Sequence, residues 1–179
     1  MRTFWLIPAT ILVAAGLGLA ASESRISSKA ADTVEDLVND KLRVPGADAY
    51  DLLGPARCTY VDGYGVVITL ELQLVFAANN MPFRAAYSPQ EVAAVRDREL
   101  KKLPLFKETL HELMAGSAST LDSLPLNQRI AIEARLFHFG WEDSKGVPGR
   151  IFMSAEKSKL LAAKANPAAL AAAIEEQDQ

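Results

Sequence analysis

The sequence predicts an α+β fold, in which an antiparallel sheet of about four strands carries one long helix on one face. Two segments, 67–76 and 129–139, alternate between apolar and polar residues, as strands with one buried face do. Between them, apolar residues recur at helical spacing over 89–118. Because strands and helices come in separate runs, the predicted element order α-β-β-α-β-β-α favours α+β over α/β.

The first twenty residues have the pattern of a signal peptide. Arg2 is positive, residues 4–19 carry no charge, and the small residues at 18–22 fit cleavage near positions 20–22. We therefore expect an exported protein, periplasmic or secreted. The alternative is an uncleaved N-terminal helix that tethers the protein to a membrane. The predicted division is a signal peptide at 1–20, an N-terminal helical segment at 21–54 and an α+β domain at 55–179, forming one domain overall.

The charge of the chain excludes one large class of partners. Without residues 1–20 it has 18 basic and 22 acidic residues, a net charge of −4. Nonspecific nucleic-acid binding needs a basic surface, so it is not expected. No membrane insertion is expected once the signal is cleaved. The single cysteine, Cys58, cannot form an internal disulfide, and is either a buried thiol or a cross-link between two chains.

The elements before the long helix follow from local patterns. Apolar residues at helical spacing predict a helix over 31–42, and residues 48–55 are expected to add one helical turn. The strands 57–61 and 67–76 flank Asp62-Gly63, a turn signal that predicts a hairpin. With a two-residue loop, Tyr60 would face Gly65 and cover its backbone, which leaves Tyr64 as the more exposed tyrosine.

The long helix has a well-marked beginning. Ser88 is the predicted N-cap, Pro89 the first helical residue, and Glu91 is placed to close a capping box. Its apolar stripe keeps the same phase across Pro104, so we predict one helix that is kinked there. After the strand at 129–139 come a closing strand at 150–155, a short helix, and a final helix that frays at the C-terminus.

Histidine patterns give little support to metal chemistry. His111 and Glu112 begin an H-E-x-x-H string, but Ala115 occupies the position of the second histidine. We therefore expect no metal site and no cofactor. His138 lies near Glu142 and Asp143, which could orient its ring for acid–base chemistry, but the same residues fit a strand end with a solvated turn.

Aromatic residues near predicted turns are the other candidates for recognition. They are Tyr60, Tyr64, Phe83, Tyr87 and Trp141. From these aromatic residues and from the turn that follows His138, we select five candidate binding residues: Tyr64, Tyr60, Trp141, His138 and Asp143.

The strings DGYGVVITLELQL (62–74) and FGWEDSKGVPGRIFM (139–153) enclose the serine-capped, charged helix. In this arrangement the chain resembles a group of uncharacterised exported bacterial proteins, in which YGVVFT-like and WEDTTG-like strings flank a long helix. The resemblance covers about 55–155. It implies a single exported domain, and it implies no activity, cofactor or catalytic residue.

A good core pattern without a catalytic motif predicts a non-enzymatic exported module that binds a protein partner or a small ligand. One alternative is a small exported hydrolase or isomerase with its site near His138, Glu142 and Asp143. A second alternative is a structural subunit that assembles with copies of itself through a sheet edge.

Overall fold

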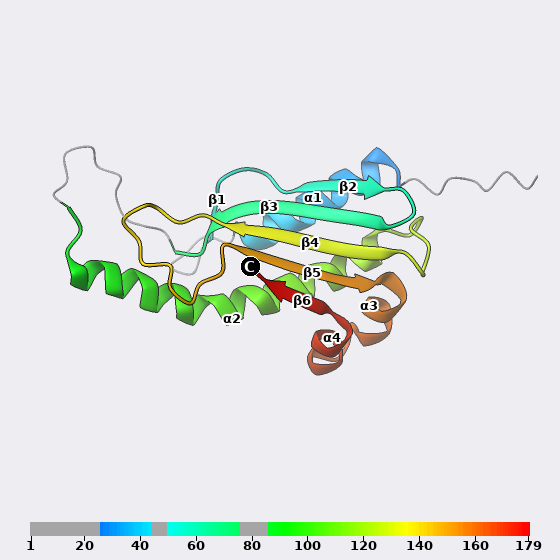
Figure 1. Ribbon diagram of the computed structural model, residues 1–179. Coiled ribbons are helices and arrows are strands. Elements are labelled where there is room, and N and C mark those ends of the chain that lie inside the picture. The colour runs from blue at the N-terminus through cyan, green and yellow to red at the C-terminus, as the bar shows by residue number, and fades with distance from the viewer. Residues whose placement is uncertain (1–25, 44–49, 76–85) are drawn as a thin grey trace, which may run out of the picture.

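The computed structural model describes residues 26–43, 50–75 and 86–179 (Figure 1). The predicted signal peptide at 1–20 lies outside these residues. Within the described ranges, no helix is long and apolar enough to cross a membrane. The elements are α1 (Ser28–Leu42), β1 (Asp51–Leu52), β2 (Arg57–Val61), β3 (Gly65–Gln73), α2 (Pro89–Thr120), β4 (Arg129–Leu136), β5 (Arg150–Glu156), α3 (Lys157–Ala163), α4 (Pro167–Ala173) and β6 (Glu175–Asp178).

The strands form one mixed sheet in the order β1-β3-β4-β5-β6, with β2 also paired to β3. β1 pairs with the end of β3 and β2 with its beginning. β3 and β4 are parallel, whereas the other pairs are antiparallel. The chain therefore combines helices with a sheet as predicted. The prediction of a purely antiparallel sheet of about four strands is wrong, because the sheet has six strands and one parallel pair.

The parallel pair follows from the length of α2. Its 32 residues extend about 48 Å at 1.5 Å per residue, whereas the eight residues of β4 extend about 27 Å. The helix therefore returns the chain past the beginning of β3, and Gly65 pairs with Arg129 at the start of both strands. A helical crossover between neighbouring strands is the usual connection of a parallel pair. The antiparallel prediction treated the strands on either side of the helix as two separate hairpins.

Two short segments also differ from prediction. Residues 51–52 pair with β3 as a strand, where a helical turn was expected. Residues 175–178 form the edge strand β6 beside β5, where a frayed helix was expected. Ile174 has an extended backbone and a buried side chain, so α4 ends at Ala173 and the next residues are placed against the sheet. Tertiary packing here overrides the helix propensity of the Ala- and Glu-rich sequence.

The start of α2 is confirmed. The Ser88 hydroxyl accepts a hydrogen bond from the Glu91 amide, and the Glu91 carboxylate accepts one from the Ser88 amide. The helix continues through Pro104 to Thr120. The N-terminal half of the helix reaches beyond the sheet, and the candidate site lies against this half (Figure 1).

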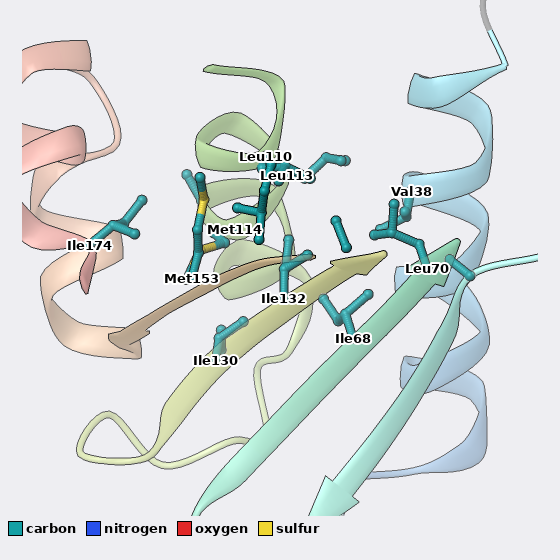
Figure 2. Packing of buried hydrophobic residues seen from close by; sticks show 14 of the residues in the cluster. Val38, Ile68, Leu70, Leu110, Leu113, Met114, Ile130, Ile132, Met153 and Ile174 are labelled. Carbon is teal, nitrogen blue, oxygen red and sulfur yellow. The ribbon is translucent and has the colours of Figure 1, made fainter. Parts of the chain in front are cut away.

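The core lies between one face of the sheet and the helices. Figure 2 shows Ile68 and Ile132 of the sheet pointing toward Met114 of α2. Val38 of α1 and Ile174 beyond α4 close the same cluster, and all five residues are buried. The opposite face of the sheet is more polar and carries Thr69, Glu71, Glu133 and Arg135. His138 lies two residues beyond the end of β4. It continues the alternation of the β4 side chains that face the core.

Candidate functional site

The β4–β5 connection, residues 137–149, packs against the N-terminal half of α2 at one end of the sheet (Figure 1). Arg96 of α2 donates a hydrogen bond to the Lys145 carbonyl at 2.9 Å and pairs with the Asp143 carboxylate at 3.1 Å. Asp143 also accepts a hydrogen bond from the Lys145 amide at 3.1 Å. The predicted candidate Asp143 thus takes part in holding this connection on the helix.

A buried acid–histidine cluster lies at the same contact. Glu99 comes from α2, whereas His138 and Glu142 come from the connection, and their side chains are 3%, 15% and 4% exposed. His138 Nδ1 lies 3.5 Å from Glu99 Oε1 and 3.9 Å from Glu142 Oε2. One ligand atom from each of the three side chains lies within 4.8 Å of the other two. We refer to these three residues as the acid–histidine cluster.

Several polar atoms of the cluster lack hydrogen-bond partners among the described residues. Among the described residues, Glu99 Oε2 and both ring nitrogens of His138 are buried without a partner in full hydrogen-bond geometry. The distance from Nδ1 to Glu99 exceeds the roughly 2.7–3.2 Å of an N–H···O hydrogen bond. Only Glu142 is fixed directly, because its Oε2 accepts the Phe139 amide at 2.7 Å. Buried polar groups are nearly always paired, so this arrangement requires an explanation.

The cluster perturbs the protonation of its members. The Glu99 carboxylate raises the pKa of His138 against the opposing effect of burial, with smaller contributions from the Pro148 carbonyl and Glu142. Burial, reinforced by the charge of Glu99, raises the pKa of Glu142. Both shifts follow from placing two carboxylates and an imidazole together where water has little access.

Sequence analysis did not identify Glu99, although a signal was present. Glu99 follows Val92 by seven residues and precedes Phe106 by seven, so it lies in the middle of the apolar stripe of α2. An ionisable residue at such a position is buried when the stripe is buried. Its partner His138 could not be identified in the same way, because the contact depends on how the 137–149 connection folds.

Aromatic side chains gather beside the cluster. Trp141 stacks on Tyr87, with ring centroids 3.7 Å apart and planes at 18°. Phe139 lies parallel to Trp141 at 6.1 Å, and the edge of Phe137 meets Phe139 at 5.2 Å. Phe137 is 40% exposed. The predicted candidate Trp141 therefore joins His138 at one end of the sheet, whereas Phe83 lies outside the described residues.

Tyr60 and Tyr64 lie at the opposite end of the sheet. Val61 pairs with Gly65 and Tyr60 with Val66, so the hairpin loop has three residues and the predicted contact between Tyr60 and Gly65 is wrong. In this loop Gly63 adopts a positive φ of 72°, and the Tyr64 amide donates to the Val61 carbonyl at 3.1 Å, which makes Tyr64 a loop residue. Gly65 lies so close to β4 that any Cβ would clash with the Arg129 carbonyl. Tyr60 packs against the core, and its hydroxyl accepts a hydrogen bond from Gln128 at 3.2 Å. Tyr64 is half-buried beside the turn.

The two other side chains considered for chemistry, His111 and Cys58, lie in surroundings typical of structural residues. His111 faces Glu176 of β6 at 3.6 Å, next to Lys107, which pairs with Glu176 and Asp178 at 2.6 Å each. The thiol of Cys58 is free. Burial, and to a lesser degree Glu35, raises the pKa of Cys58 to about 11, which keeps the thiol protonated at neutral pH.

Two hollows lie away from the cluster. One, of about 780 Å³, runs between α2 and α4 and includes His111 and Lys164. The other, of about 350 Å³, lies on the polar face of the sheet between Arg57 and Arg135. Neither includes His138. Comparison of the chain with protein-family models, curated proteins and solved structures finds no match.

Proposed function

We propose that the protein is an exported, non-enzymatic binding module, which holds a protein partner or a small ligand at the end of the sheet formed by the 137–149 connection and α2. The observation that carries this proposal is the stack of Tyr87, Trp141 and Phe139. Rigid aromatic rings supply large contact areas at little conformational cost, which is why they are enriched where proteins bind partners. Export rests on the signal-peptide pattern and on the family resemblance.

The candidates Tyr60 and Tyr64 cannot share this site. Gly65 and Leu72 pair with the first and last residues of β4, so the tyrosines lie at the beginning of that strand and His138 lies beyond its end. The eight residues of β4 separate them by about 27 Å. A small ligand therefore contacts one end only, and the proposal assigns recognition to the end with Trp141.

The test is binding by matched aromatic variants. The immobilised protein is used to capture partners from periplasmic extract, and the affinity of each captured partner is then measured for wild type, Trp141→Ala and Tyr64→Ala. We expect Trp141→Ala to weaken binding at least about tenfold and Tyr64→Ala to leave it unchanged. If Tyr64→Ala abolishes binding and Trp141→Ala does not, the proposed surface is wrong.

One observation favours the hydrolase or isomerase alternative. His138 lies beside two carboxylates, as a general acid or base requires. A substrate would also need an opening at His138, whose side chain is only 15% exposed. Turnover of model ester or peptide substrates that is abolished by His138→Ala would support this alternative over the binding module.

Self-assembly is a third proposal, with less support. β6 lies at a free edge of the sheet and its residues are exposed, so its backbone could pair with another chain. Three of its four residues are acidic, however, and although Lys107 and Arg129 pair with them, two such strands would bring like charges together. Light scattering that finds only monomer at high protein concentration would reject this alternative.

A further inference from the structure

We propose that the acid–histidine cluster binds one divalent transition-metal cation, with zinc the best match to its donors. The ligands are Nδ1 of His138 and one carboxylate oxygen each from Glu99 and Glu142. This inference goes beyond partner binding and does not depend on it. The sequence-based expectation of no metal site covered the whole chain, His138 included, so this proposal departs from it.

The separations within the cluster suit ligands of one cation better than they suit hydrogen bonds. His138 Nδ1 lies 3.5 Å from Glu99 Oε1 and 3.9 Å from Glu142 Oε2. Zinc binds nitrogen and carboxylate oxygen at about 2.0–2.2 Å, which places neighbouring tetrahedral ligands about 3.4 Å apart. All three ligand atoms lie within 4.8 Å of one another, so the side chains would draw together around the cation on binding.

The negative charge of the two carboxylates also favours the binding of a cation. Two carboxylates with side chains only 3% and 4% exposed lie beside a single imidazole. Burying a carboxylate without compensation is strongly unfavourable, and a neighbouring carboxylate adds repulsion. Among the described residues, Glu99 Oε2 has no partner, although it is buried. A divalent cation would neutralise both carboxylates at once, whereas protonation of His138 would neutralise one.

The donor set narrows the choice of metal. Calcium takes six to eight oxygen ligands at about 2.3–2.6 Å, and an imidazole is a poor substitute for them. One imidazole with two carboxylates suits zinc and its neighbours in the first transition row. Three protein ligands would leave a position for water or for an atom of a bound partner.

The surroundings orient the ligands. The Phe139 amide donates to Glu142 Oε2 at 2.7 Å, and the pairing of Arg96 with Asp143 holds the 137–149 connection on α2. Such contacts around the ligands fix side-chain geometry in metal sites. Because Glu99 comes from α2 and the other two ligands from the connection, the metal would join both elements and fix the position of Trp141.

The test is titration of the purified, EDTA-treated protein with zinc chloride in a calorimeter. We expect one zinc per chain, and an affinity at least about tenfold lower in Glu99→Gln and in His138→Ala. Two matched controls should bind as wild type does. Asp97→Asn alters an exposed acid of α2 outside the cluster, and His111→Ala removes the only other histidine of the sequence.

A second measurement keeps the result decisive. Cobalt(II) bound in place of zinc should give visible absorption bands that are lost in Glu142→Gln, and circular dichroism reports whether each variant folds. Three results would overturn the proposal: no stoichiometric binding, unchanged affinity in folded Glu99→Gln, or loss of binding in His111→Ala. Zinc binding that survives in Trp141→Ala while partner binding is lost would separate this inference from the proposed function.

Discussion

Two buried charged side chains, Lys157 and Glu99, lie near opposite ends of the sheet and differ in how many hydrogen-bond partners the fold gives them. Lys157 is 4% exposed, and its ammonium group donates to the carbonyls of Leu121, Leu124 and Asp122 at 2.6, 2.7 and 3.3 Å. Glu99 is 3% exposed and has a carboxylate oxygen without a partner among the described residues. The first charge is satisfied by its own chain and therefore serves structure. The second has no comparable set of partners among the described residues, and this difference is the basis of the proposed metal site.

The satisfied charge should be the costlier to remove. The ammonium group of Lys157, the first residue of α3, lies at the C-terminal end of α2, where a cation is favourable. Its loss would leave buried carbonyls without their donor. We expect Lys157→Met to lower the free energy of unfolding by about 2–4 kcal/mol in urea denaturation. Lys159→Met, on the exposed face of α3, is the control and should change the free energy of unfolding by less than about 0.5 kcal/mol. Equal losses would mean that the carbonyl contacts of Lys157 contribute nothing.

The tyrosines test whether the hairpin end is structural. Tyr60 packs on the core and accepts a hydrogen bond from Gln128, whereas Tyr64 lies beside the turn. We expect Tyr60→Ala to cost about 2 kcal/mol and Tyr64→Ala less than about 1 kcal/mol. Thermal melting of both variants measures the difference. Equal losses would show that Tyr64 is as much a part of the core as Tyr60.

Removing the charge of Glu99 should change the free energy of unfolding only slightly. In metal-free protein, Glu99→Gln deletes a buried carboxylate whose compensation is incomplete, while it keeps the shape of the side chain. We expect the free energy of unfolding to stay within about 1 kcal/mol of wild type, or to rise. Urea denaturation in EDTA measures it. A loss as large as that of Lys157→Met would mean that Glu99 is satisfied internally after all.

The smallest expected effect is a pH dependence confined to the cluster. Glu99 raises the pKa of His138 above 6.5, and burial raises the pKa of Glu142 above 4.5. A group with a raised pKa binds more protons when folded, so its contribution to stability is lost as pH rises through the folded pKa. We expect the Tm of EDTA-treated protein to fall between about pH 5 and pH 8, and to fall less steeply in Glu99→Gln. An identical slope in both proteins would exclude Glu99 as the cause.

The parts of the fold that could be predicted are those determined locally. The capping box of Ser88 and Glu91, and the alternation that marks β3 and β4, depend on residues close together in the sequence. The parallel pairing of those strands depends instead on where a helix of 32 residues returns the chain. β6 was missed for a related reason, because its position is set by the packing of Ile174.

The candidate site was predicted in part. His138, Glu142 and Trp141 follow one another closely after β4, so their common location could be anticipated. Glu99 is 39 residues away from His138 in the sequence, and only the packing of the 137–149 connection on α2 brings the two together. The position of Glu99 within an apolar stripe does mark it as unusual. A charged residue at the centre of such a stripe merits attention in other sequences.

The most direct test of the difference between the two buried charges is crystallographic. Crystals of the protein grown with zinc should show an anomalous difference peak at the zinc absorption edge between Glu99, His138 and Glu142, within about 2.0–2.2 Å of one atom from each. The account predicts this peak, and its absence from crystals of Glu99→Gln. Wild-type crystals with no peak at the cluster, or with zinc only at His111, would contradict the claim that the unsatisfied end of the sheet is built to bind a metal.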